Sequence, residues 1–447
     1  MLNKKIDSYL KENYYPFHMP GSKRSNFLRS DLPYGRDFTE IEGFDNLNDP
    51  SDIFVEMENE IADLYGVNDA IISTNGSTCG ILASIRSLHS ENKNILIQRS
   101  CHKAVYNAIE VFDLKSDYIN VLTNEIGAIV GIDYDTLYNK ISTKNYGSLV
   151  ITSPSYEGYD LDLEKIYGIC KEFDTKLILD MAHGSHYILF DRYKKYFDVA
   201  ITSFHKNLSA LTPSAAILIN DENLTADIRR NMAIFQTSSP SYVLLQSIDD
   251  MISNFNLFEE LTSDLRKNLN SIYDLKLKNL QIMDKSIKDR SKILISTSCA
   301  NISGDELAKL LRAEKIESEM AYPSYCLLIA TIFDSNHGFK MLKEALLKID
   351  KKLTSSKKDF EFFYNIPKKQ LEIADAMRIT SRSNLLEDSV GKIAGQFVYA
   401  YPPGIPLVIP GETIDDKTIK NMKHMQANDI KLNIDKYISI IDWQKNE

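Results

Sequence analysis

The sequence predicts an α/β fold with a mostly parallel sheet, followed by a smaller α+β unit. Short apolar runs such as Ser148–Thr152 and Lys176–Asp180 alternate with amphipathic segments. This alternation is typical of a parallel sheet covered by helices on both faces. Polar motifs follow several of the runs, at the carboxyl ends of strands where such sheets bind ligands. With 447 residues, the chain is longer than one hydrophobic core usually holds.

The first half of the chain supplies the expected elements in turn. A short helix before Pro16 leads into an irregular arm, and a helix from Ser51 ends at Gly66. Two further helices are expected, one that begins at the segment Asn75–Thr78 and runs through Leu88, and one over Ala104–Val111. The expected strands are Ala70–Thr74, Ile95–Ile97, Ser148–Thr152, Lys176–Asp180, Asp198–Thr202 and Ala215–Ile219.

The pattern changes after a long helical region that is expected from Ser241 to about Leu280. Beyond it we expect strands at Lys292–Ser296 and Ser324–Thr331 and helices at Gly304–Leu311, Phe339–Leu353 and Asp388–Tyr399. We also expect a solvated linker at Lys351–Lys369 and a turn with a short edge strand at Tyr401–Glu412. We therefore expect an N-terminal arm (1–48), a large domain (49–285) and a small α+β domain (286–447).

Composition narrows the class of protein. The net charge of −10 argues against a nucleic-acid surface, and 43% hydrophobic and 26% charged residues are ordinary for a globular chain. The five cysteines are scattered without a Cys-x-x-Cys pair, so neither a disulfide framework nor a zinc cluster is indicated. With no signal peptide or membrane-length apolar run, a cytoplasmic protein is expected.

The segment Ser203-Phe-His-Lys206 comes directly after a predicted buried strand. Burial disfavours the charged form of a lysine, and an uncharged lysine can form a Schiff base with an aldehyde cofactor. A loop lysine in solvent is the alternative, and it would be preferred for this motif alone. The cofactor interpretation is favoured by Asp180-Met-Ala-His183, which lies at the end of the preceding predicted strand.

Asp180 has several possible roles at the end of its strand. Its carboxylate could cap a helix, bind a metal or hold a protonated ring nitrogen. A metal reading would use His183, His186 and His205 as ligands, but the site offers no thiolate, and Gly184 disfavours a helical arrangement of the first two histidines. Capping and core hydrogen bonding remain the alternative, and we expect no metal.

The segment Asn75-Gly-Ser-Thr78 lies where a helix is expected to begin. Backbone N–H groups and two hydroxyls there could bind a phosphate, although Ser and Thr are also common helix N-caps. One phosphate site, one strand-end carboxylate and one lysine together suit pyridoxal 5′-phosphate. His102 follows another strand end and could stack on the pyridine face, or it could be a solvent-exposed loop histidine.

With these motifs in order, the chain resembles the Orn/Lys/Arg decarboxylase family of fold-type I (aspartate aminotransferase-like) pyridoxal phosphate enzymes. The resemblance covers roughly residues 16–415 and matches the short form, which lacks the receiver-like N-terminal domain of the long members. The motifs that carry it are His18-Met-Pro-Gly21, Asp37-x-Thr-Glu-Ile41, Asn75-Gly-Ser-Thr78, Cys101-His-Lys103, Asp180-x-Ala-His-Gly184, Ser203-x-His-Lys206, Thr237-Ser-Ser-Pro-Ser-Tyr242 and Tyr401-Pro-Pro-Gly-Ile-Pro406.

The resemblance implies a role for each site residue. Lys206 would carry the cofactor, Asp180 would pair with its ring nitrogen, and His183 would lie near its phenolic oxygen. Ala182 would pack under the ring and His102 would stack on it. The residues implied in phosphate binding are Ser77, Thr78, Ser203 and His205, with Thr237 and Ser238 reaching the phosphate of the partner in a homodimer.

The implied reaction is α-decarboxylation of arginine, lysine or ornithine to agmatine or a diamine plus CO2, which would feed polyamine synthesis. The candidate carboxylates for the distal cation of the substrate are Glu157 and Glu412, although a solvated Glu157 is equally expected. Ser22 stands where the family usually has a histidine, which leaves the role of the arm open.

Two other functions remain compatible with the same scaffold, because a fold does not fix its chemistry. An aminotransferase or lyase would clamp the substrate's α-carboxylate with an arginine, for which Arg378 and Arg382 are candidates. A binding protein that keeps the fold would hold the cofactor without turning over an amino acid.

Overall fold

The computed structural model describes residues 1–447 except 284–288, 358–365, 401–404, 428–430 and 443–447. The chain forms two compact units, each assembled from separate parts of the sequence. The first contains Met1–Ser90 and Leu177–Ser263, and the second contains Glu91–Lys176 and Asp264–Glu447. The predicted division at residues 48/49 and 285/286 stays a prediction.

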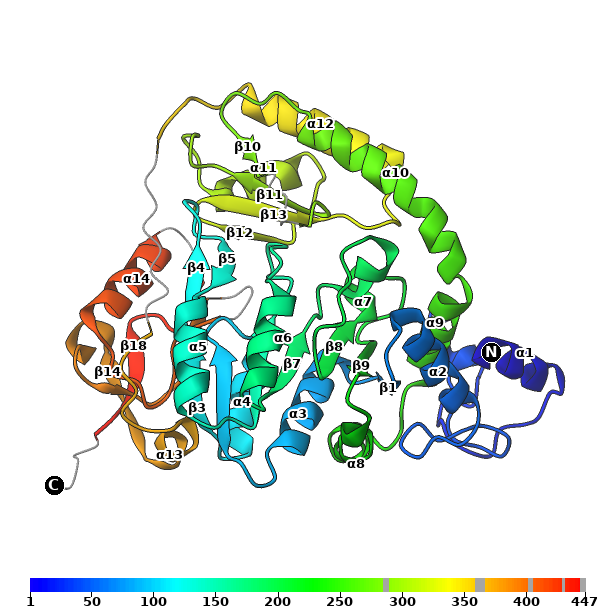
Figure 1. The fold of residues 1–447 in the computed structure, drawn as a ribbon. Helices are drawn as coiled ribbons and strands as arrows, with labels where there is room; N and C mark the ends of the chain where they lie inside the picture. Colours follow the sequence, from blue (N-terminus) through cyan, green and yellow to red (C-terminus); the bar gives the residue numbers. More distant parts are fainter. Residues whose placement is uncertain (284–288, 358–365, 401–404, 428–430, 443–447) are drawn as a thin grey trace. The chain divides into compact units, whose positions relative to one another are not determined.

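The first unit is built around four strands in the order β1-β9-β8-β7 (Figure 1). These strands are β1 (Asp69–Ser73), β9 (Ala215–Ile219), β8 (Val199–Ser203) and β7 (Lys176–Asp180). β7 and β8 are parallel, whereas β9 runs antiparallel to both β8 and β1. β1, β8 and β7 therefore all point the same way, and their carboxyl ends meet at one edge.

The helices of this unit arise from apolar faces that pack on or beside the strands. They are α1 (Leu2–Lys11), α2 (Ile53–Tyr65), α3 (Gly76–Leu88), α7 (Phe204–Asn207), α8 (Thr225–Phe235), α9 (Tyr242–Ser253) and the start of α10 (Phe255–Tyr273), with short 3-10 turns at Tyr34–Arg36, Ser185–Leu189 and Glu222–Leu224. α2 buries Ile53, Phe54, Met57 and Ile61 and ends at Gly66 in the left-handed conformation, as predicted. α3 packs closely because an added Cβ at Gly80 would lie 3.0 Å from Ile217.

The second unit contains three parallel strands in the order β6-β2-β3. They are β6 (Ser148–Thr152), β2 (Asn94–Gln98) and β3 (Lys115–Ile119). The helices of this segment are α4 (Lys103–Val111), α5 (Tyr134–Thr143) and α6 (Leu163–Glu172), and a small hairpin joins β4 (Val121–Thr123) to β5 (Ile129–Ile132). With the parallel strands of the first unit, this confirms the predicted α/β class with a mostly parallel sheet.

The remainder of the second unit is the smaller C-terminal α+β part that the sequence predicts. Its antiparallel sheet runs β10-β11-β13-β12, over Gln281–Ile282, Lys292–Ser296, Tyr325–Ile329 and Met320–Tyr322. The other strands are β14 (Ser381–Leu385), β15 (Ile393–Ala394), β16 (Val398–Ala400), β17 (Ile405–Val408) and β18 (Tyr437–Ile441). The helices are α11 (Gly304–Ala313), α12 (Asn336–Asp350), α13 (Ile373–Arg378) and α14 (Asp416–Ala427), with a 3-10 turn at Leu386–Ser389.

Two predicted helices are corrected by the structure. Residues 388–399 do not form an α-helix; they contain the end of a 3-10 turn, β15 and the start of β16, and residues 395–397 separate the two strands. Gly391 adopts φ +79°, which interrupts a right-handed helix, and the apolar residues around it pair as strands instead. The long helical region from Ser241 is two helices that break at Asn254, and the second ends at Tyr273.

The predicted linker at Lys351–Lys369 lies partly outside the described residues, and its last residue is partly buried and paired. Lys369 Nζ lies 2.7 Å from Glu372 Oε1 and also donates to the Ser116 carbonyl. Part of the predicted turn at Tyr401–Glu412 also lies outside them, and the rest gives the expected short strand, β17, paired with β16. Among the described residues, no helix is long and apolar enough to cross a membrane.

Candidate active site

The sheet of the first unit brings three sequence motifs to one edge. Ser73 of β1 and Ser203 of β8 both pair with Ala215 of β9, so these two strands end at the same level. Asp180, the last residue of β7, lies in register with Ile201 of β8. The segments that follow these strand ends contain Ser77, His183 and Lys206, which the sequence predicted to lie together.

Lys206 and His183 form the centre of this cluster. Lys206 lies on the single turn α7 and is only partly buried, whereas His183 is 8% exposed. The Nζ atom of Lys206 lies 3.0 Å from Nε2 of His183. An amine beside an imidazole can exchange a proton with it, which suits a lysine that must act as a nucleophile and later as an acid.

Asp180 is a buried carboxylate with little compensation. Its side chain accepts a hydrogen bond from the backbone N–H of Ala182 at 3.1 Å, and the residue is 4% exposed. No ion pair involves Asp180 anywhere in the described part of the chain. A buried charge normally has a partner, so this position fits a cationic group supplied by a ligand, such as a protonated ring nitrogen.

Hydroxyl groups gather near the N-terminus of α3. Ser77 Oγ and Ser203 Oγ are 2.5 Å apart, and Ser203 is fully buried while Ser77 is partly buried. Thr78 is exposed at the start of the same helix. Helix N-terminal N–H groups and two converging hydroxyls suit a phosphate.

His205 is fixed beside this cluster. Its Nδ1 contacts the Ser214 carbonyl at 2.9 Å, which requires that Nδ1 carries the proton. Burial, which is the largest cause, and the neighbouring Lys206 lower the pKa of His205 below its usual value, although the bond to Ser214 acts in the opposite direction. His205 is therefore expected to be neutral near pH 7, with Nε2 as an acceptor from a protonated group.

Thr237 and Ser238 follow α8 and are both exposed. The backbone N–H of Thr237 donates to Asn75 Oδ1 at 3.3 Å, and its carbonyl accepts from Asn48 Nδ2 at 3.1 Å. These bonds hold the exposed segment beside the residue that precedes α3, within the same chain.

Three predicted site residues belong to the second unit. His102 is the N-cap of α4, where its Nδ1 accepts a hydrogen bond from the Ala104 N–H at 3.2 Å. Glu157 is not solvated, because it is 2% exposed and accepts from Tyr325 OH at 2.9 Å and Ser155 Oγ at 3.1 Å. Burial raises the pKa of Glu157, so the solvated alternative considered from the sequence is wrong.

Glu412 has a cationic partner that sequence reasoning missed. Its two carboxylate oxygens accept from NH1 and NH2 of Arg99 at 2.7 and 2.8 Å, and both side chains are buried. The available signal was an arginine two residues after the apolar run Ile95–Ile97, since a charge at a strand end needs a partner. Glu412 therefore presents no uncompensated carboxylate to a substrate, whereas Glu157 has two neutral hydroxyl donors as its partners.

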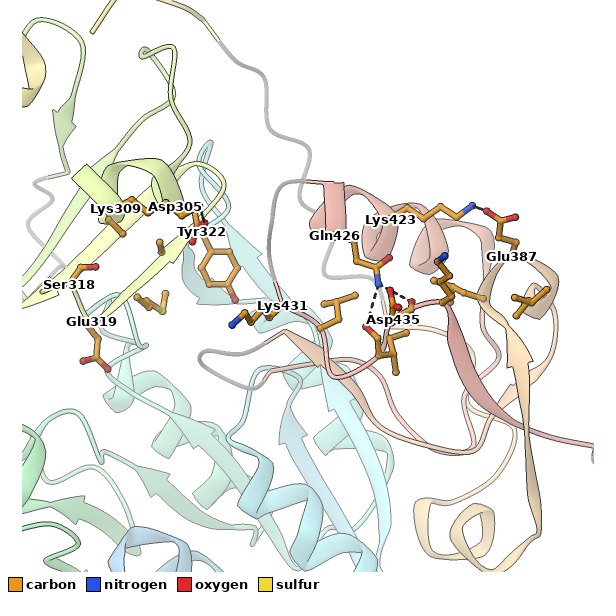
Figure 2. A pocket seen from close by; sticks show the side chains of 18 residues that line it. Asp305, Lys309, Ser318, Glu319, Tyr322, Glu387, Lys423, Gln426, Lys431 and Asp435 are labelled. Atoms are coloured by element: carbon orange, nitrogen blue, oxygen red, sulfur yellow. Dashed lines mark hydrogen bonds and ion pairs between the residues drawn. The ribbon is translucent and has the colours of Figure 1, made fainter. Parts of the chain in front are cut away.

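A cavity of about 1120 Å³ lies elsewhere in the second unit (Figure 2). Residues of α11, β12 and α14 line it together with Lys431–Lys436, and its charges are mixed, as with Lys423 beside Glu387 and Lys309 beside Asp305. None of the predicted site residues is among its lining residues.

The comparisons with known proteins decide the family. The family model described as "Orn/Lys/Arg decarboxylase, major domain" matches residues 2–282, more than half of the chain, and "Orn/Lys/Arg decarboxylase, C-terminal domain" matches residues 357–432. The chain belongs to the Orn/Lys/Arg decarboxylase family. It is accordingly an amino acid decarboxylase that uses pyridoxal phosphate, as predicted.

Individual relatives agree with this family. An arginine decarboxylase of Bacillus subtilis is 26% identical over 90% of this chain and 89% of its own length. An arginine decarboxylase of Halalkalibacterium halodurans is 25% identical over 95% of this chain and 92% of its own. The crystal structure of a lysine decarboxylase from Francisella novicida has the same fold, with a TM-score of 0.82 and 18% identity over 99% of this chain and 81% of that one.

Proposed function

We propose that this protein catalyses α-decarboxylation of arginine to agmatine and CO2, with Lys206 as the residue that binds the cofactor and exchanges it with the substrate. The observation that supports this proposal most strongly is the contact of 3.0 Å between Lys206 Nζ and His183 Nε2, close in sequence to the uncompensated carboxylate of Asp180. When bound, pyridoxal phosphate accepts the electron pair that remains on Cα after the carboxylate leaves.

Each residue of the first unit has a task in this proposal. Asp180 holds the ring nitrogen protonated, and Ala182 supports one face of the ring. Ser77, Thr78, Ser203 and His205 bind the phosphate, which fixes the ring in the plane that the reaction requires. His183 orients the amine of Lys206 and takes part in moving its proton, and Lys206 returns a proton to the product before release.

We also propose that His102 stacks on the cofactor ring, as the family resemblance implies. Because its Nδ1 accepts a backbone N–H, the neutral ring carries its proton on Nε2. We also propose a homodimer in which Thr237 and Ser238 reach the partner's phosphate. Mixing the inactive Lys206→Ala variant with a Thr237→Val/Ser238→Ala variant of reduced activity should give more activity than the two variants give separately, whereas no gain in verified mixed dimers would contradict a shared site.

The choice of arginine rests on the relatives. The relatives named arginine decarboxylase match at least 90% of this chain, whereas the constitutive lysine decarboxylase of Escherichia coli matches 55% of it. A role in polyamine synthesis follows if agmatine is the product. Lysine is the second candidate, because its side chain also ends in a cation and the structure assigns no side chain to that group.

A substrate panel tests this proposal. Purified enzyme with pyridoxal phosphate is incubated separately with arginine, lysine and ornithine, and CO2 and the amine product are quantified together. We expect stoichiometric CO2 and agmatine, with the highest kcat/KM for arginine. A cadaverine or putrescine product would move the assignment to lysine or ornithine, and conversion of an added keto acid without CO2 would overturn it in favour of an aminotransferase.

A further inference from the structure

A buried ion pair in the second unit joins two distant parts of the sequence. Arg99 and Glu412 meet through two parallel hydrogen bonds of 2.7 and 2.8 Å, and their side chains are 2% and 0% exposed. A third bond, from the Ile409 N–H to Glu412 Oε2 at 3.0 Å, holds the carboxylate on its other side. The guanidinium group also lies 5.1 Å from the centre of the Tyr118 ring.

Arg99 belongs to the turn that leads to His102. β2 ends at Gln98, and α4 begins at Lys103 with His102 as its N-cap. Tyr106 of α4 donates its hydroxyl to the Arg99 carbonyl at 2.6 Å, so the backbone of Arg99 is tied to the helix that His102 caps. The side chain of Arg99 ties the same turn to Glu412.

The backbone around Glu412 is equally constrained. Gly411 adopts φ +89°, and an added Cβ there would lie 2.4 Å from the Leu371 carbonyl oxygen. The Gly411 N–H bonds the Ala394 carbonyl at 2.9 Å, and the Ala394 N–H bonds the Glu412 carbonyl at 2.8 Å. Glu412 is therefore held by rigid backbone on one side, which makes it a fixed anchor for Arg99.

Stability alone is a weak reason for such a pair. The cost of removing two charges from water is often as large as the attraction between them, so apolar replacements of similar volume are frequently neutral or stabilising. What the pair does supply is geometry, because a bidentate Arg–carboxylate bond fixes both distance and plane.

We propose that the Arg99–Glu412 ion pair is a positioning device that fixes the turn carrying His102, so that the imidazole is presented in one orientation to the cofactor ring. This inference rests on the proposed function, because it requires that His102 stacks on that ring. Arg99 and Glu412 are positioning residues, since they act through His102. Glu412 thereby has a task different from the substrate contact that the sequence predicted.

A double-mutant cycle that combines a replacement of the ion pair with His102→Ala tests the inference. Arg99→Met/Glu412→Leu removes both charges at similar volume, and it is measured in the holoenzyme with and without His102→Ala. We expect kcat to fall about 10²-fold, as for a small misplacement of a reacting group, with KM changed less than about twofold. The visible circular dichroism of the bound cofactor should change as well, because it reports the asymmetry of the ring's surroundings.

The cycle separates positioning from simple stability. If the ion pair acts through His102, replacing the pair in the His102→Ala variant causes almost no further loss of kcat and no further change in the dichroism. The effects of the pair and of His102 are then not independent. Losses that multiply fully in that background would overturn the inference, as would normal kcat and dichroism in the Arg99→Met/Glu412→Leu enzyme.

A matched pair in the first unit provides the control. Arg229 NH2 and Glu58 Oε2 are 2.8 Å apart, and the Glu58 side chain is 3% exposed. Arg229→Met/Glu58→Leu should leave the cofactor dichroism unchanged and should combine additively with His102→Ala. Non-additivity for this control pair as well would overturn the inference, because any buried pair would then act in the same way.

Two further measurements keep the result interpretable. If the apolar double variant does not fold, Arg99→Lys takes its place, since lysine keeps the charge but cannot form the bidentate bond. Additive effects of Arg99→Lys and His102→Ala on kcat would then overturn the inference. If the wild type releases no CO2 from any basic amino acid, the proposed function fails, whereas the dichroism cycle still decides between a coupled and an independent ion pair.

Discussion

The Lys206 cluster and the Arg99–Glu412 pair are both buried groups of polar side chains, but they are completed differently. The carboxylate of Asp180 has one backbone N–H as its partner, and the amine of Lys206 contacts an imidazole. Arg99 and Glu412 instead satisfy each other with two bonds. The carboxylate of Asp180 keeps its charge available for a ligand, whereas the charges of Arg99 and Glu412 are used inside the protein.

This difference distinguishes catalytic polar groups from positioning polar groups. A catalytic group must change partners during turnover, so a tight ion pair would oppose its function. A positioning group must not change partners, and a bidentate pair serves that purpose. Replacements in the Lys206 cluster should therefore reduce activity more than stability, and single replacements at Arg99 or Glu412 should reduce stability strongly.

The largest expected effect is on activity at Lys206. Lys206→Ala should lower kcat by more than about 10³-fold, because it removes both the nucleophile and a proton donor. The variant should still bind cofactor and should retain bound substrate that it cannot release. Borohydride reduction followed by mass spectrometry should show a cofactor-sized mass gain in the wild type and none in the variant.

A lysine outside the cluster gives the control for this prediction. Lys194 is exposed in the same unit, and Lys194→Ala should keep both the mass gain and the activity. Normal turnover by Lys206→Ala, or an unchanged mass gain after reduction, would place the attachment on another lysine.

Next in size is the loss of stability at Glu412. Glu412→Gln leaves the buried guanidinium of Arg99 without its counter-charge, and breaking a buried pair from one side typically costs about 3–5 kcal/mol. Urea unfolding of cofactor-free protein should show this loss, whereas Lys206→Ala should change the free energy of unfolding by less than about 1 kcal/mol. Equal losses in the two variants would remove the distinction between the two regions.

Replacing Asp180 should reduce activity almost as much as replacing Lys206. Asp180→Asn keeps the shape and the acceptor for Ala182 but removes the charge that holds the ring nitrogen protonated. We expect kcat to fall about 10²–10³-fold, the usual size for one electrostatic contact in a transition state. Asp191→Asn, at an exposed position nearby in sequence, should have no effect, and a fall of similar size there would indicate a general loss of charge rather than a specific contact.

Glu58 tests whether pairing alone keeps a buried carboxylate ionised. Burial raises the pKa of Glu58 from 4.5 to about 7, although Arg229 and the Ile72 N–H act in the opposite direction. The folded protein then holds this proton more tightly than the unfolded chain does. Its contribution to stability is present below pH 4.5 and is lost as the pH rises through about 7.

The measurement for Glu58 is a difference between two pH profiles. The free energy of unfolding of the wild type minus that of Glu58→Gln should decrease by about 3 kcal/mol between pH 4 and pH 8, since each pKa unit corresponds to about 1.4 kcal/mol. A difference that stays constant over this range would mean that Arg229 keeps Glu58 ionised throughout.

Sequence reasoning worked best where a pattern is local. Strand ends followed by polar motifs at Ser77, Asp180 and Ser203 were visible as periodicity, and parallel strands of similar length bring their ends together. The contact between Lys206 and His183 follows from that arrangement. These positions depend on short stretches whose conformation the neighbouring residues determine.

Contacts between residues far apart in the sequence could not be predicted from the sequence. Arg99 and Glu412 lie more than 300 positions apart, and nothing near either residue indicates the other. Glu157 likewise looked free, because its partner Tyr325 belongs to a distant strand. The failed helix at 388–399 has a related cause, since pairing with distant segments such as β18 stabilises short strands that local propensity does not indicate.

The smallest expected effect concerns the two hydroxyls at the phosphate site. Ser203→Ala removes one hydrogen bond of about 1 kcal/mol, so the affinity for pyridoxal phosphate should fall about fivefold in equilibrium titration. Because Ser77 Oγ and Ser203 Oγ are 2.5 Å apart, Ser77→Ala/Ser203→Ala should lose less than the sum of the single losses. Ser8→Ala, at an exposed position of α1, provides the control. Fully additive losses would mean that the two hydroxyls bind the phosphate independently, and unchanged affinity would remove them from the site, leaving the N–H groups of the helix N-terminus to hold the anion.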